Sequence, residues 1–216
     1  MDAAILRQHG IKDILKLKFR KAAEEGVIYF PVEGELVTAS ATRTVEIDAL
    51  RFDAITGSVM SMQPVLPVTA DLLIVCEGDS DRAAIAILAE RILAAAGSRR
   101  SIKILTAMGK ITIPKVANSL WNTFHTESKV LIVTDADNDP AGTLAMLHNG
   151  LEFNEWVAAI PNPSIETWLG VKVQFVRRKG QSRANICRDA AKTLDIDALR
   201  ASDAEFARFY DAILGP

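Results

Sequence analysis

Residues 129–142 read KVLIVTDADNDPAG, and this stretch decides the fold. Its first half is short, apolar and rich in β-branched residues, which predicts a strand buried on both faces of a sheet. Asp135, Asp137 and Asp139 follow where that strand ends, and Pro140 suits the first turn of a helix. We therefore predict a strand, an acidic loop and a helix in succession.

Outward from this stretch, the same arrangement recurs on both sides. DLLIVCEGDSD at 71–81 predicts a buried strand that ends at Glu77, followed by an alanine-rich helix that Gly97 closes. SIKILTA at 101–107 and EWVAAIP at 155–161 predict two further strands, with helical segments between them. This alternation predicts an α/β fold, Rossmann-like, with a mainly parallel four-stranded sheet flanked by helices.

Residues 1–69 follow a different pattern, and we expect a small α+β region of unknown role there. Apolar residues at helical spacing predict a helix across 11–19. VIYFPV and ELVTASA predict a β-hairpin whose turn is Glu33-Gly34. The segment 58–68 contains two prolines and is expected to be a linker.

The remaining residues, 70–216, are expected to form the main domain with a helical C-terminal tail. In that tail, Ser202 and Glu205 have the spacing of a helix capping box. With 49% hydrophobic and 24% charged residues, the composition is that of an ordinary globular protein that buries a substantial core.

Acidic residues fall at the ends of three of the four predicted strands. Glu77 and Asp81 follow the first, Asp135 and Asp137 the third, and Glu166 the fourth, in PSIETWL. The carboxyl ends of parallel strands meet at one edge of a sheet, so these side chains should gather there. Two carboxylates 4 Å apart repel each other by about 4 kcal/mol at an effective dielectric near 20, so either their pKa values rise or cations neutralise them.

Oxygen ligands of this kind predict Mg²⁺ or Mn²⁺, and two such ions suit phosphodiester cleavage. Asp139 is a further candidate ligand, with a turn residue as the alternative. A calcium-binding EF-hand is excluded, because its loop needs glycine and glutamate where Pro140 and Met146 stand.

The ordered set of motifs resembles a TOPRIM domain over roughly residues 71–180. EGDSD at 77–81, Met108-Gly109-Lys110 and PSIETWL are most similar to the branch of OLD (overcoming lysogenisation defect) nucleases. The resemblance implies a metal-dependent endonuclease, linked in this branch to defence against phage. It also implies a role for each matching position: one metal on Glu77, Asp81 and Asp135; a second on Asp137, Glu166 and Ser164; and Lys179 as the residue that steadies the transition state.

Larger OLD proteins carry a fused ATPase, which this sequence lacks. Gly109-Lys110 has Ile104 where the phosphate-binding loop requires glycine. A separate ATPase chain is therefore an expected partner. Topoisomerase and primase are disfavoured, because no topoisomerase tyrosine domain fits and two cysteines cannot build the zinc module of a primase.

The formal net charge is −2, so nucleic acid, DNA or RNA, must be bound through local basic residues or metal ions. The best basic patch is formed by Arg177, Arg178, Lys179, Arg183 and Arg188, and Lys110 is a further candidate for phosphate contact. A solvated helix face is the alternative for this patch.

The two cysteines, Cys76 and Cys187, lie far apart, and Cys76 is expected to be inert packing in a strand. Neither a signal peptide nor a membrane-spanning apolar run occurs, which predicts a cytoplasmic protein. The sequence leaves open whether the protein forms a homo-oligomer.

Two other functions stay open beside the nuclease. The domain could be a regulatory or binding subunit without catalysis. It could also be a phosphatase of the haloacid-dehalogenase type, in which Asp135 becomes phosphorylated. That motif normally opens its domain and continues with glycine and threonine, whereas here Asn138-Asp139 follows.

Overall fold

The computed structural model describes residues 20–21, 27–53, 58–64, 70–124, 129–171 and 182–215. The chain divides into two compact units. One comprises Met1–Glu33 and Val45–Val68, and the other comprises Gly34–Thr44 and Thr69–Pro216. The helix predicted across 11–19 lies outside the described residues.

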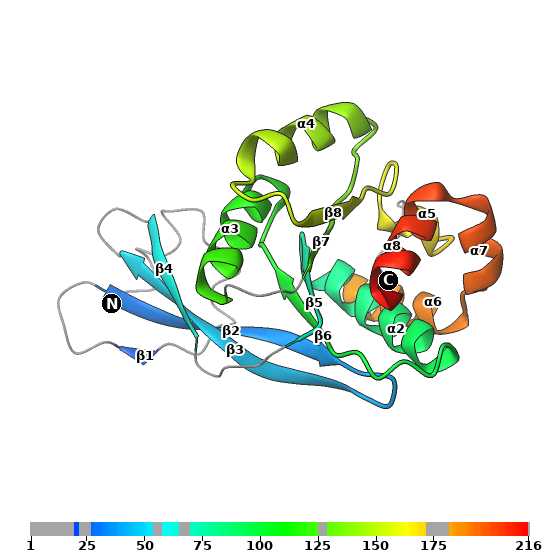
Figure 1. The fold of residues 1–216 in the computed structure, drawn as a ribbon, viewed down its shortest axis with the longest axis horizontal. Coiled ribbons are helices and arrows are strands. Elements are labelled where there is room, and N and C mark those ends of the chain that lie inside the picture. Colours follow the sequence, from blue (N-terminus) through cyan, green and yellow to red (C-terminus); the bar gives the residue numbers. More distant parts are fainter. Residues whose placement is uncertain are drawn as a thin grey trace. The chain divides into compact units, whose positions relative to one another are not determined.

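The second unit is built on four parallel strands in the order β6-β5-β7-β8 (Figure 1). They are β5 (Leu72–Cys76), β6 (Ile102–Thr106), β7 (Lys129–Val133) and β8 (Trp156–Ala159). Cys76 is in register with both Thr106 and Val133, so β5, β6 and β7 end level. The predicted parallel sheet is confirmed, and residues that leave these strands start from one edge.

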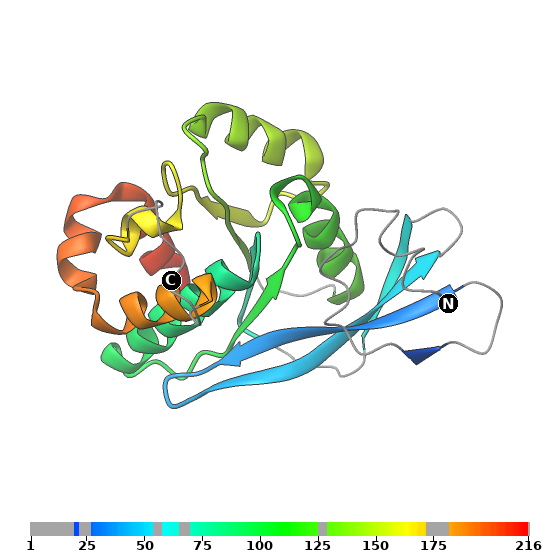
Figure 2. The ribbon, with the colours of Figure 1, turned by 180° about the vertical axis from the view of Figure 1, so that it is seen from behind.

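Helices cover both faces of these strands (Figures 1 and 2). One side carries α3 (Ile113–Phe124) and α4 (Pro140–Gly150). The other carries α2 (Asp79–Ala95) and two helices of the C-terminal tail, α6 (Arg183–Thr193) and α8 (Ala204–Leu214). The short α5 (Ile165–Trp168) and α7 (Ile196–Ser202) complete the described helices of this unit, with the 3₁₀ turn η2 (Lys110–Thr112).

Alternate strand residues build the core beneath α2, α6 and α8. In β5, Leu72, Ile74 and Cys76 belong to this buried cluster, as the two-residue period of a strand requires. Phe206 and Phe209 of α8 pack around buried Trp168, with ring centroids 5.2 Å and 5.6 Å from it. The Cys76 thiol is fully buried, and this burial raises its pKa well above the ordinary value. Cys76 is thus a packing residue, as predicted.

The hairpin turn lies later than predicted. Strand β2 (Val27–Val37) runs straight through Glu33-Gly34, and its last three residues pair antiparallel with β6. The turn is instead at Thr38–Ala41, where Thr38 N donates to Ala41 O at 3.0 Å. Pairing with β6 holds the end of β2 extended, and this tertiary contact overrides the local preference of Glu33-Gly34 for a turn.

The first unit contains antiparallel pairs. Strand β1 (Arg20–Lys21) pairs with the start of β2, and β3 (Thr42–Asp53) pairs with β4 (Ser58–Pro64). The prediction of a linker over 58–68 is therefore wrong for its first seven residues. Pro64 is compatible with a strand because it stands at the last position of β4, an edge strand.

The predicted cap of the last helix is displaced by one residue. Asp203, not Ser202, caps α8, and its Oδ1 accepts from Phe206 N at 2.8 Å. Helices α7 and α8 are so close in sequence that Ser202 still belongs to α7 and bonds back to Ala198 O. The Glu205 carboxylate accepts instead from Ile160 N, just after β8.

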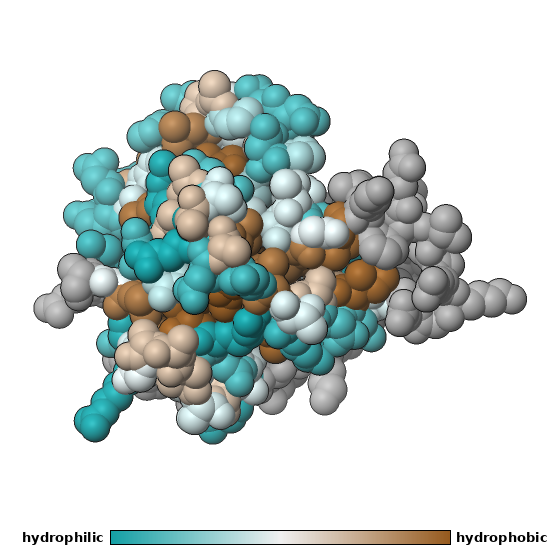
Figure 3. Space-filling view, turned by 90° about the vertical axis from the view of Figure 1, so that its right-hand side faces the viewer, coloured by the Kyte–Doolittle hydropathy of each residue, from teal (hydrophilic) through white to brown (hydrophobic). Residues whose placement is uncertain are grey.

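The surface over the C-terminal helices is mixed in character. Figure 3 shows the side at the right of Figure 1, where hydrophobic residues gather in a band between hydrophilic ones. Among the described residues, no helix is both long and apolar enough to cross a membrane.

Candidate metal centre

Glu77 and Asp135 meet where β5 and β7 end. Glu77 follows β5, and its Oε1 accepts from Thr134 Oγ1 at 2.5 Å and from Asp135 N at 3.0 Å. Thr134 follows β7 and is buried. The level ends of neighbouring strands thus place a carboxylate on the first residues of the next acidic loop.

Asp81 lies in the first turn of α2 and is 8% exposed. Its Oδ2 accepts from Gly78 N at 3.1 Å, which also helps to cap the helix. Burial, and after it the charge of Glu77, raises the pKa of Asp81 to about 6. A helix cap alone would lower this pKa, so the raised value reflects burial first and the nearby acids second.

Asp135 is the most perturbed of the acids that follow the strands. Burial raises its pKa to about 7, against the hydrogen bond from Ile165 N, and the charges of Asp81, Glu77 and Glu166 raise it further. Its Oδ1 accepts from Ile165 N at 2.8 Å. Three acids therefore lie close enough to shift the pKa of Asp135. We call the four residues together the carboxylate cluster: Glu77, Asp81, Asp135 and Glu166.

Glu166 reaches this cluster because the loop after β8 is fastened to the loop after β7. Ala136 N donates to Pro161 O and Asp137 N to Pro163 O, each at 2.9 Å. Glu166 is 3% exposed, and its Oε2 accepts from buried Ser164 Oγ at 2.7 Å. Ser164 is thus placed beside Glu166, where it orients that carboxylate.

Arg183, at the start of α6, neutralises Glu166. Its Nε donates to Glu166 Oε1 at 2.5 Å, and a second guanidinium nitrogen forms an ion pair with the same carboxylate. Burial pushes the pKa of Glu166 upward, but hydrogen bonds from Ser164 and Arg183 outweigh it, so the pKa is lowered. Arg183 was predicted as a nucleic-acid contact, and the structure places it within the acidic site.

Asp137 and Asp139 stand apart from the carboxylate cluster. Asp137 is exposed, and its Oδ2 lies 2.9 Å from Lys110 Nζ, so the loops after β6 and β7 are joined by an ion pair. Asp139 is the N-cap of α4, with its Oδ1 accepting from Gly142 N at 2.9 Å. The geometry of Asp139 therefore matches its alternative reading as a turn residue.

These two joined loops contain unusual backbone. Among the described residues, the non-glycine positions with positive φ are Met108, Asp137 and Asn138, at 60°, 53° and 67°. Such conformations cost roughly 1–3 kcal/mol each and concentrate at functional sites. The strain thus falls at the same edge of the sheet as the acids.

As the side chains stand, no three histidine, cysteine, aspartate or glutamate residues in the described part of the chain converge tightly enough to hold a metal. Their oxygens are taken by main-chain N–H groups, hydroxyls, Arg183 and Lys110. The donor set itself fits a hard divalent cation, because all its ligating atoms are oxygen and its charges repel one another. Metal binding at this edge would require these carboxylates to exchange present partners for the ion.

Three predicted site residues, Arg177, Arg178 and Lys179, lie outside the described residues and stay predictions. The sequence did not predict three contacts, which are the Thr134 hydroxyl on Glu77, the pairing of Arg183 with Glu166 and the pairing of Lys110 with Asp137. The only sequence signal for Thr134 is its place directly before Asp135. Arg183 carries no local signal, because its partner is 17 residues away.

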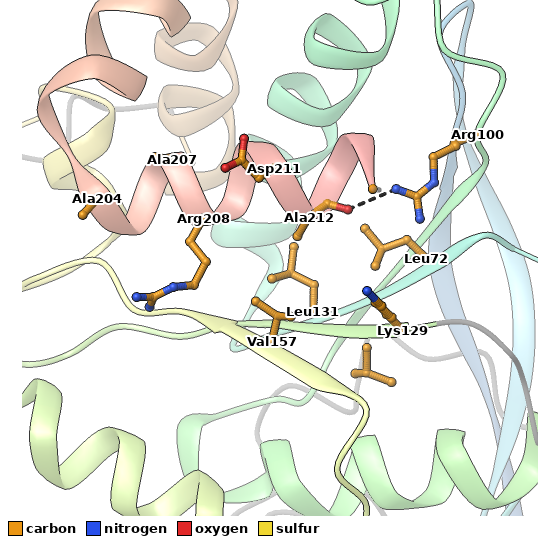
Figure 4. Close-up of a pocket in the computed structure, with 12 residues that line it drawn as sticks. Leu72, Arg100, Lys129, Leu131, Val157, Ala204, Ala207, Arg208, Asp211 and Ala212 are labelled. Atoms are coloured by element: carbon orange, nitrogen blue, oxygen red, sulfur yellow. Dashed lines mark hydrogen bonds between the residues drawn. The ribbon is translucent and has the colours of Figure 1, made fainter.

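A hollow of about 620 Å³ lies away from the acids, between α8 and the starts of the strands (Figure 4). Leu131 and Val157 form part of its apolar wall, and Arg100 closes one end by donating to Ala212 O at 3.2 Å. None of the candidate metal ligands lines it. Its chemistry is therefore separate from that of the carboxylate cluster.

Comparison with known proteins gave a match to a family model and matches to solved structures. No curated protein matched. A chain from the structure of bacteriophage T7 lagging-strand DNA polymerase interacting with primase domains of two gp4 subunits, bound to an RNA/DNA hybrid and dTTP, shares 11% identity with this protein. The match covers 74% of this chain and 76% of that chain, with a TM-score of 0.29. A score this low does not establish a shared overall fold.

The family model described as "Overcoming lysogenization defect protein-like, TOPRIM domain" matches residues 69–137. The elements of this segment follow in the predicted order, and it includes Glu77, Asp81, Lys110, Asp135 and Asp137. The resemblance inferred from the motifs is confirmed: the chain contains a TOPRIM domain of the OLD-like type.

Proposed function

We propose that the protein is a divalent-metal-dependent nuclease that cleaves phosphodiester bonds of DNA or RNA. The observation that carries this proposal is the carboxylate cluster, in which burial first, and then the charges of three neighbouring acids, raise the pKa of Asp135. It lies at the edge of the sheet where parallel α/β folds hold their ligands. TOPRIM domains occur in nucleases and primases, which act on nucleic acids, and this supports the same conclusion.

In this proposal Glu77, Asp81 and Asp135 hold one Mg²⁺ or Mn²⁺ ion, and Asp137, Glu166 and Ser164 hold or orient a second. Two such ions, when bound, would activate the attacking water and stabilise the leaving oxygen. Asp139 is left out of this ligand set because it caps α4.

The other polar groups of the site have supporting roles in the proposal. Thr134 holds the Glu77 carboxylate by its hydrogen bond, and Ser164 does the same for Glu166. Lys110 and Arg183 balance acidic charge and are placed to turn toward phosphates of a bound strand. Lys179 is proposed to steady the transition state, and Arg177 and Arg178 to contact the backbone.

The OLD-like type of the domain supports two further parts of the proposal. A separate ATPase chain is the proposed partner, and defence against phage is the proposed setting. The phosphatase alternative loses its support, because Asp135 falls within the segment that matches a TOPRIM model.

The proposal is tested by cleavage of supercoiled DNA and of structured RNA with Mg²⁺ or Mn²⁺. Glu77→Ala is expected to abolish cutting. Asp189→Ala, which removes an exposed acid that pairs with Lys192 on α6, serves as the matched control and is expected to retain it. Failure of the wild type to cut either polymer, with or without a candidate ATPase, contradicts the nuclease. Equal activity of Glu77→Ala and wild type contradicts the site.

A further inference from the structure

Large hydrophobic side chains that lie in solvent are few in the described part of the chain. They are Met108, Ile111 and Leu144, which are 50%, 84% and 40% exposed. A single exposed hydrophobic residue is ordinary on a protein surface. Met108 and Ile111, however, both belong to the short β6–α3 loop, residues 107–112, which starts at the carboxyl end of β6.

Hydrogen bonds hold the β6–α3 loop in one shape. Ala107 N donates to Cys76 O at 2.8 Å, and Gly109 N donates to Glu77 O at 2.9 Å. Thr112 Oγ1 closes the loop by donating to Ala107 O at 2.5 Å and to Gly109 O at 2.7 Å. The loop is therefore fastened to the main chain of Glu77, and its apolar side chains are presented on a preformed support.

The backbone of this loop is held in a conformation that side chains disfavour. Met108 has φ +60° and Gly109 has φ +130°. Lys110 stands between the two apolar residues and pairs with Asp137 of the neighbouring loop. A strained, fixed loop with the order apolar, glycine, cation, apolar thus borders the carboxylate cluster.

We propose that Met108 and Ile111 contact an unstacked base of the nucleic-acid strand held at the carboxylate cluster, and that they make the protein favour unpaired or distorted sites. This inference rests on the proposed nuclease function and adds to it the class of substrate. Apolar side chains that wedge against bases are a known means of unstacking a duplex. Lys110, between them, suits the phosphate of the same strand.

The alternative occupant, a protein partner, fits this surface less well. A stable protein interface buries about 800 Å² on each partner, with a contiguous apolar centre. Two exposed side chains separated by a lysine do not make such a centre. Because the loop lies beside the acids, it would also contact the nucleic-acid strand that the site binds.

The test uses the full-length protein and one oligonucleotide sequence in two forms, as a perfect duplex and as a duplex with a short mismatched bubble. 2-Aminopurine in the bubble reports unstacking by a rise in fluorescence. Affinities are measured by fluorescence anisotropy in Ca²⁺, and cleavage of the same probes is measured separately in Mg²⁺. Met108→Ser and Ile111→Ser are compared with Leu144→Ser, the control for an exposed hydrophobic residue outside the loop.

The wild type is expected to bind the bubble more tightly than the duplex and to raise the 2-aminopurine signal. Each loop variant should lose about fivefold in affinity for the bubble, the effect of roughly 40 Å² of apolar contact. Neither loop variant should change duplex binding, and Leu144→Ser should change neither. Lys110→Ala should instead weaken both probes alike, as a phosphate contact does.

The inference is overturned if both loop variants match Leu144→Ser in binding and fluorescence while the wild type still cleaves; the nuclease proposal then survives alone. It is also overturned if the variants keep nucleic-acid binding but lose a protein partner. If the wild type neither binds nor cuts any probe, both proposals fail together.

Discussion

At the scale of single residues, Thr134 provides a direct test of the proposed site. Its hydroxyl donates to Glu77 Oε1, so replacing it with valine removes the bond that fixes a proposed ligand. Loss of such an orienting bond typically weakens metal affinity about 10- to 100-fold. We expect Thr134→Val to do so in Mn²⁺ calorimetry, and Thr134→Ser to restore binding. Equal affinities in wild type and Thr134→Val would rule the role out.

Arg183 is predicted to stabilise the protein most when no metal is bound. In Arg183→Ala, the buried Glu166 carboxylate loses its cation, although the arginine side chain is itself 61% exposed. Screening by solvent reduces the loss to about 1–2 kcal/mol in the free energy of unfolding. Urea denaturation should show this loss without metal and a smaller one in Mg²⁺.

Arg188→Ala is the control for Arg183→Ala, because Arg188 is a cation of the same helix whose guanidinium donates to exposed Asn185, three residues earlier. It should change stability by less than about 0.5 kcal/mol. A loss as large in Arg188→Ala, or one that Mg²⁺ leaves unchanged in Arg183→Ala, would contradict the account.

At the scale of elements, helix α4 separates the two interpretations of Asp139. As the N-cap, Asp139 should matter to stability, and Asp139→Ala should lower the free energy of unfolding by about 1 kcal/mol. Asp139→Asn keeps a capping oxygen and should restore most of it. Both variants should retain cleavage. If Asp139→Asn is stable but inactive, Asp139 is a metal ligand after all.

Helices and strands could be predicted from the sequence where neighbouring residues determine them, and not where contacts with distant segments do. The strands and helices from residue 70 onward were predicted well, because periodicity, Pro140 and Gly97 act on their own neighbours. The turn at Glu33-Gly34 was wrong because β2 continues through that dipeptide and pairs at Glu35–Val37 with β6, a distant segment. The cap at Ser202 was wrong because a second capping residue, Asp203, follows it directly.

The same distinction between local and distant contacts applies to the candidate site. Strand ends can be read from the sequence, so the gathering of the acids after β5, β7 and β8 was predictable. The pairing of these acids with cations was not, because Arg183 and Lys110 come from other segments of the chain, the start of α6 and the 3₁₀ turn η2. The positive φ of Met108 was not predictable either, because methionine rarely adopts this conformation, whereas Asp137 and Asn138 are residue types that do.

At the scale of the whole molecule, the carboxylate cluster predicts how stability changes with pH. Asp81 and Asp135 have pKa values raised to about 6 and about 7. The folded state therefore holds these protons more tightly than the unfolded chain. Stability without metal should be greatest below pH 4, fall as pH rises from about 4 to 7, and level off above.

The size of this fall, allowing for partial exposure of Asp135, is on the order of 2 kcal/mol. Urea denaturation at several pH values checks it. Asp135→Asn should flatten most of the decline, and saturating Mg²⁺ should oppose it by binding the ionised form. A free energy of unfolding that rises between pH 4 and 7 in the metal-free wild type would contradict the coupling of these acids.

Main-chain hydrogen bonds join the loop after β8 to the loop after β7, and they decide how short a fragment of this protein can keep the site intact. The segment that matches the family model stops at residue 137, but Asp135 accepts from Ile165 N, and Glu166 and Arg183 lie further on. A fragment of residues 69–137 would contain four proposed ligands, but it would lack the hydrogen bond from Ile165 and the residues Glu166 and Arg183. The portable unit of this protein therefore extends at least to residue 183.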